Sequence, residues 1–141
     1  GPRPQRSVVF MAVTAEEKGL LGSEYYAANP LYPAAKTAGA INTDVLGVLG
    51  RARDYSVRGN QKFGLLDMLQ EEAAKRGRRF TPDPAAATGT FYRSDHFTFA
   101  KAGIPALSFT PGRDLVNGGT TRGDAWEKKY RDVMYHQPAD E

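Results

Sequence analysis

The sequence predicts an α/β sandwich with a largely parallel sheet. Two observations indicate this class. Short apolar runs alternate along the chain with longer segments of helical periodicity. The first of these runs is apolar throughout, as is typical of strands buried on both faces inside parallel sheets. With 141 residues, the chain is long enough for one domain with a substantial core.

The first third of the chain is predicted to form a strand, a helix and two further strands. Residues 8–13, VVFMAV, are apolar and partly β-branched, which favours a buried strand. A helix follows at 19–28, and Pro30 ends it. The next strands are predicted at 38–47, AGAINTDVLG, and at 54–59, DYSVRG.

The clearest helix lies in the middle of the chain. Four apolar side chains recur there at helical spacing and form one face, while polar residues fill the other positions. They are Phe63, Leu66, Leu69 and Ala73. Asn60 is the predicted N-cap, and Gly77 fits the position just past the C-terminal end.

The rest of the chain continues the alternation of strands and helices. Ser94 is the predicted N-cap of a helix that Gly103 ends. The predicted elements are a short strand beginning at Arg79, a helix at 95–102, a strand at 105–110, a Gly-rich loop at 114–124 and a helix at 126–136.

Composition excludes several classes of protein. The chain has no cysteine, which excludes disulfide scaffolds, thiolate zinc sites and cysteine nucleophiles. It has no run of 18 apolar residues, so we expect no membrane-spanning segment. The net charge is only +3, and the basic run at 75–79, KRGRR, is interpreted as a solvated helix end, where cations favour the helix dipole. We therefore expect no nucleic-acid partner.

Acidic and imidazole side chains follow the predicted strands, open a helix or lie in the last segment of the chain. They are Glu16, Glu17, Asp44, Asp95, His96 and His136. Because sites in parallel α/β sheets form at the carboxyl ends of strands, several of these side chains could share one crevice. Carboxylates and imidazoles suit a divalent ion such as zinc. One of the adjacent glutamates could then hold the metal while its neighbour acts as the general base.

A purely structural interpretation of the same residues stays open at this point. Glu16 and Glu17 could form the acidic first turn of a helix, with Thr14 and Glu17 as a capping box. Asp44 could be an ordinary turn residue, and His96 a locally hydrogen-bonded residue at a helix start. The spacing of the candidates forms no compact local metal motif, so the residues alone do not decide between the two interpretations.

Four motifs taken together resemble the M28 family of zinc metallopeptidases, the aminopeptidase type with co-catalytic zinc ions. They are AVTAEEKGLLGS, INTDVLG, RSDHFTFAKAGIPAL and YHQPADE, in the family's order. The resemblance covers nearly the whole chain. It implies an α/β/α sandwich with a mixed, largely parallel sheet, a peptide substrate and two zinc ions in the complete site.

The resemblance also implies roles for individual residues. Glu16 matches the general base and Glu17 a zinc ligand. Asp44 matches a ligand of the other zinc, and His136 matches the last zinc ligand.

Three further residues, Tyr92, Asp95 and His96, lie where the family lines the rim of its active site, which implies contacts with substrate. Tyr92 could donate to the developing oxyanion, and Asp95 could hold a ligand histidine or a substrate amine.

The chain departs from the family pattern because it has neither the His-x-Asp motif nor the metal-bridging Asp that precede the first motif. Residues 1–141 are therefore expected to be the C-terminal portion of the catalytic domain, with an incomplete zinc site. Alone, the chain is expected to bind zinc weakly or not at all and to have little activity. An incomplete sheet would also expose an edge, which oligomerisation or swapping with another copy could cover.

Two alternative functions remain open. One is a glutaminyl cyclase-like enzyme with a single zinc, because the acidic segment of those enzymes resembles SDH at 94–96. The other is a non-catalytic M28-like domain that serves in binding or structure. The family resemblance suggests export from the cell, but the chain itself does not indicate a compartment.

Overall fold

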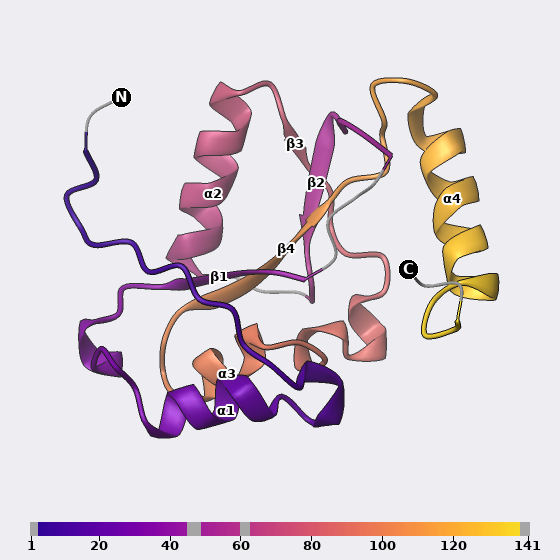
Figure 1. The fold of residues 1–141 in the computed structure, drawn as a ribbon. Helices are drawn as coiled ribbons and strands as arrows, with labels where there is room; N and C mark the ends of the chain where they lie inside the picture. The colour runs from indigo at the N-terminus through magenta and orange to yellow at the C-terminus, as the bar shows by residue number, and fades with distance from the viewer. Residues whose placement is uncertain (1–2, 45–48, 60–62, 139–141) are drawn as a thin grey trace.

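The computed structural model describes residues 3–44, 49–59 and 63–138, and its sheet has four strands in the order β1–β4–β2–β3 (Figure 1). The strands are β1 (Ala40–Thr43), β2 (Asp54–Val57), β3 (Arg79–Phe80) and β4 (Ala106–Pro111). β4 pairs in parallel with β1 and antiparallel with β2, and β2 pairs in parallel with β3. The sheet is therefore mixed and largely parallel, which confirms the predicted fold class.

Helices lie on both faces of this sheet (Figure 1). The α-helices are α1 (Leu21–Ala28), α2 (Gly64–Lys75), α3 (His96–Lys101) and α4 (Gly119–Val133). Short 3-10 turns join them: η1 (Glu16–Lys18), η2 (Ala34–Lys36), η3 (Ala86–Thr88) and η4 (Thr90–Tyr92). Among the described residues, no helix is both long enough and apolar enough to cross a membrane.

Two apolar clusters fill the spaces between the layers. Under α2, Val57 of β2 and Leu107 of β4 pack against Leu66, with Phe63 and Leu69 at the margin. On the opposite face, α3 packs against β4 to form a second cluster, and the ring of Tyr26 from α1 packs against it. That second cluster consists of Phe99, Ile104 and Ala106, with Tyr26, Ala34, Ala40 and Ala100 against it. The helical face predicted from the sequence is thus the face that α2 buries.

Strand register decides which polar side chains meet on the face that carries α3. Asn42 of β1 is the register partner of Ser108 of β4. The backbone N–H of Arg58, just past β2, donates to the Ser108 carbonyl at 3.0 Å. Because side chains alternate between faces along a strand, Asn42, Ser108 and Arg58 share the face opposite Leu107 and Val57. Asp44 is two residues past Asn42 and, by the same alternation, lies on the same face.

The first predicted strand is wrong. Residues 8–13 form no strand in the structure and run as an exposed segment, with Phe10 94% and Val8 60% exposed. A β-branched apolar run becomes a strand only when a neighbour supplies a hydrogen-bonding ladder and a surface to cover it. No described strand pairs with residues 8–13, and β1 has only β4 as a partner.

Several predicted helix boundaries also differ. Asn60 lies outside the described residues, and the observed N-cap of α2 is Phe63. The N-cap of α3 is Asp95 rather than Ser94. α4 begins at Gly119, inside the predicted loop, and ends before His136. Within this helical part of the predicted loop, Gly123 is buried against the Arg113 carbonyl, where an added Cβ would lie 2.1 Å from the oxygen, so the packing requires glycine.

Candidate active site

The two adjacent glutamates lie on a tight turn that precedes α1. η1 contains both residues, and the residues next to the turn, Ala15 and Leu20, have positive φ angles of 56° and 61°. The left-handed region is costly for residues with a Cβ, by about 1–2 kcal/mol each, and such strain is concentrated at functional sites. α1 has Leu20 as its N-cap and no side-chain capping bond, so Thr14 and Glu17 do not cap it. The structure thus offers no support for the capping-box interpretation.

The second glutamate contacts the predicted imidazole ligand. His136 Nε2 lies 2.7 Å from Glu17 Oε1, although the residues are 119 positions apart in the chain. His136 has a φ of 57°, and its ring stacks on Tyr135 with centroids 3.9 Å apart. The turn after α4 therefore presents the imidazole to the turn before α1.

Asp44 follows β1 and is held by two donors. Ser94 Oγ donates to Asp44 Oδ2 at 3.1 Å, and Arg58 Nη2 lies 3.3 Å from the same oxygen. Ser94 in turn accepts a 2.7 Å hydrogen bond from Asn42 Nδ2. Ser94 is completely buried, so this chain of hydrogen bonds anchors Asp44 to the interior.

The charges of Glu17, Asp44 and Asp95 act on Glu16, and we refer to these four residues as the acidic cluster. Burial is the largest cause that raises the pKa of Glu16, and the charges of Asp44, Glu17 and Asp95 raise it further. Arg58 opposes this rise. The pKa of Tyr135 is raised first by burial and then by Glu17. Glu16 is therefore a carboxyl group whose affinity for a proton is increased.

The three predicted rim residues have different environments. Tyr92 is 62% exposed, and its ring lies edge-on to Phe91 and Phe97. Asp95 is 8% exposed, and its Oδ1 atom has no hydrogen-bond partner among the described residues. Tyr92 is thus exposed at the surface, whereas the unpaired oxygen of Asp95 is buried.

His96 is completely buried, and its ring packs edge-on against Phe91 at 5.0 Å. Neither ring nitrogen has a hydrogen-bond partner within the described part of the chain. Burial, followed by the charge of Arg58, lowers the pKa of His96 to about 4. The imidazole is therefore neutral at physiological pH, and it lies in the protein interior rather than on an exposed rim.

The described carboxylates and imidazoles do not form a complete set of metal ligands. In the described ranges, no group of three or more His, Asp or Glu side chains is arranged to hold an ion. Glu17 Oε1 and His136 Nε2 lie 2.7 Å apart, which is a hydrogen-bond distance and shorter than the roughly 3.3 Å that separates two ligands of a tetrahedral zinc ion. Asp44 faces Ser94 and Arg58 instead. The described residues thus form a hydrogen-bonded Glu17–His136 pair and a separately anchored carboxylate, Asp44.

Reasoning from the sequence missed Arg58 and the link from Ser94 to Asp44. Arg58 follows a predicted strand just as Asp44 does, so the same rule about strand ends could have drawn attention to it. Ser94 was interpreted as a helix cap, which is the usual role of serine at that position. Its bond spans 50 residues, and local patterns do not show such a contact.

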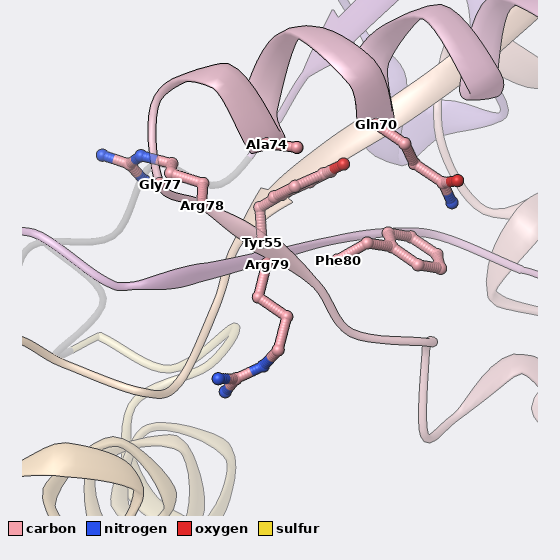
Figure 2. A pocket seen from close by; sticks show the side chains of 7 residues that line it. All are labelled: Tyr55, Gln70, Ala74, Gly77, Arg78, Arg79 and Phe80. Atoms are coloured by element: carbon pink, nitrogen blue, oxygen red, sulfur yellow. The ribbon is translucent and has the colours of Figure 1, made fainter.

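A pocket of about 480 Å³ lies elsewhere, between α2 and the strands β2 and β3 (Figure 2). Figure 2 shows Tyr55 reaching under the helix near Ala74, while Arg79 points away from it. None of the residues predicted for the site lines this pocket. It is therefore separate from the acidic cluster.

Comparison with known proteins places this α/β architecture among the peptidases. The model of peptidase family M28 matches residues 1–141, so the chain belongs to that family. No curated protein matches the chain.

Solved structures of aminopeptidases are similar to it. An aminopeptidase from Aneurinibacillus sp. strain AM-1 has a TM-score of 0.54 at 24% identity, covering 77% of this chain and 27% of that protein. BSAP, a zinc aminopeptidase from Bacillus subtilis, has a TM-score of 0.54 at 27% identity, covering 72% of this chain and 25% of that protein. The chain thus spans about a quarter of the length of these relatives.

Proposed function

We propose that this chain provides part of the active site of a zinc-dependent aminopeptidase, which hydrolyses the peptide bond after a free N-terminal residue. The observation that carries the proposal is the contact between Glu17 and His136, 119 positions apart, in the same cluster as Glu16 and Asp44. The zinc aminopeptidase BSAP, 27% identical over the matched part, supports the reaction class.

In this proposal, Glu17 and His136 hold one zinc ion and Asp44 contributes to a second. Zinc, when bound, supplies Lewis acidity that makes a water molecule easier to deprotonate. Glu16 is the general base, because a raised pKa allows a carboxylate to take a proton from water and return it to the leaving amine. Exposed Tyr92 can donate a hydrogen bond to the oxyanion, and the charge of buried Asp95 helps to raise the pKa of Glu16.

The small number of protein ligands predicts that this chain binds zinc weakly. A catalytic zinc ion takes three protein ligands and a structural one takes four, whereas Glu17 and His136 supply two. We therefore expect little peptidase activity from this chain alone.

Calorimetric titration with zinc tests the proposed site. The chain should bind zinc weakly, and Glu17→Ala should abolish the signal. Glu24→Ala is the matched control, because Glu24 is an exposed glutamate paired with Lys101 outside the cluster. Zinc binding that Glu17→Ala leaves unchanged would refute the site.

The role of Glu16 has its own test. Glu16→Gln should preserve zinc binding and remove whatever hydrolysis of leucine p-nitroanilide the zinc-loaded chain shows, because glutamine cannot accept the proton. Unchanged turnover would exclude Glu16 as the base.

A further inference from the structure

Arg58 is the cation of the acidic cluster. Its Nη2 atom lies 3.3 Å from Asp44 Oδ2, and the two side chains are only 23% and 33% exposed. The same positive charge counteracts the raised pKa of Glu16 and of Tyr135 and contributes to the lowered pKa of His96. Arg58 is thus electrostatically linked to both halves of the proposed site, Asp44 on one side and the neighbours of Glu17 and His136 on the other.

The backbone places Arg58 there. Val57, the last residue of β2, is buried in the core under α2. The N–H of Arg58 donates to the Ser108 carbonyl, which continues the pairing with β4 by one residue. Gly59 follows with a φ of 81°, and a Cβ on it would lie 2.8 Å from Phe91 Cβ. The chain on both sides of Arg58 is therefore held in place, and the charge is a constant feature of the site.

A cation at this position has two physical effects. It stabilises carboxylates that would otherwise repel one another, since like charges in a partly buried site are destabilising. It also contacts one of the two oxygens through which Asp44 could bind a metal ion, and a guanidinium repels a divalent cation. Both effects act on Asp44, whose Oδ2 atom accepts from Arg58 and from Ser94.

We propose that Arg58 is the internal counter-cation of the acidic cluster and competes with a divalent metal ion for Asp44. The inference rests on the proposed function for the identity of that ion. It adds a residue of this chain that limits metal affinity, so occupancy of the site depends on the displacement of Arg58 as well as on the number of ligands.

The test is zinc titration by calorimetry on the full chain and three variants. Arg58→Gln should bind zinc about tenfold more tightly than the wild type, since a partly screened unit charge acts on the site with roughly this effect. Arg58→Lys keeps the cation and should bind like the wild type. Arg53→Gln is the matched control for net charge, because Arg53 pairs with Asp114 rather than with the cluster.

A second measurement needs no metal. The melting temperature of the metal-free chain should fall in Arg58→Gln and recover in Arg58→Lys, because only the latter neutralises the carboxylates. A double-mutant cycle locates the effect: in an Asp44→Asn background, Arg58→Gln should no longer raise zinc affinity.

Equal zinc affinity of the wild type and Arg58→Gln, measurable or not, would overturn the inference. A gain that persists in the Asp44→Asn background would overturn it too. The proposed function fails on a different result, namely zinc binding that survives Glu17→Ala.

Discussion

Asp83 accepts three hydrogen bonds and ties the loop after β3 to the end of β2. The donors are the N–H groups of Gly59 and Ala85, both at 2.9 Å, and Thr90 Oγ1 at 2.6 Å. Through Gly59 it supports the residue next to Arg58, and through Thr90 it supports the turn that carries Tyr92. Asp83→Ala removes all three bonds at once.

The structure allows the cost of this substitution to be worked out. A hydrogen bond to a charged group contributes about 1.5–3 kcal/mol, and three would give at least about 4.5 kcal/mol if they were additive. Asp83 is half-buried, so solvent screens the charge and the loop can relax. Gly59 is buried, however, and its N–H would lose its acceptor. We expect Asp83→Ala to lower the free energy of unfolding by about 2–3 kcal/mol at pH 7.

This loss should depend on pH. Burial raises the pKa of Asp83. The hydrogen bonds from Gly59, Thr90 and Ala85 together lower it by more than burial raises it, so the pKa lies below the ordinary value of 3.8. A carboxyl group with a lowered folded pKa contributes its full stabilisation above its unfolded pKa and loses it as the pH falls through the folded pKa. The deficit of Asp83→Ala should therefore be full at neutral pH and shrink below about pH 3.8.

Urea unfolding followed by far-UV circular dichroism, at pH 7 and at about pH 3, measures both effects. Asp132→Ala is the control, because Asp132 is an exposed aspartate paired only within α4, with Lys128. It should change stability by no more than about 0.5 kcal/mol. An Asp83→Ala variant as stable as this control, or a deficit that is the same at both pH values, would refute the reasoning.

Two further predictions use the same unfolding assay. Gly112→Ala should cost at least about 3 kcal/mol, because its Cβ would lie 2.0 Å from Asp54 Oδ1 and 2.5 Å from the Asp54 carbonyl carbon. Gly64→Ala, with nothing within 4 Å of the added Cβ, should be neutral or stabilising, and equal costs for the two would contradict the packing argument. Tyr55→Phe should leave stability unchanged or raise it by up to about 1 kcal/mol, since the buried hydroxyl has no partner among the described residues. A loss of more than about 1 kcal/mol would show that the hydroxyl makes a stabilising bond.

Much of the fold could be predicted because its elements have local signatures. The apolar face of α2 recurs at helical spacing, and the strands around Ile41 and Leu107 are apolar runs followed by turn residues. Residues 8–13 have the same signature and form no strand. A strand needs a partner, and an apolar pattern does not show whether one is present.

In the candidate site, too, the sequence shows the residue types but not the contacts between residues far apart in the chain. The residue types at 16, 17, 44 and 136 are compatible with a zinc site, because carboxylates and imidazoles are among the ligands of zinc, and the resemblance to the M28 family selects this interpretation. The contacts of these residues, in contrast, join positions far apart in the chain. Glu17 meets His136 across 119 residues, and Ser94 meets Asp44 across 50.

The sequence by itself determined the alternation of elements and the chemistry of the side chains, since both depend on residues close together in the chain. Only the tertiary structure decided which side chains touch. Strand register brought Arg58 to Asp44, and the turn after α4 brought His136 to Glu17. Register and packing depend on the free energy of the whole chain, so no local segment encodes them.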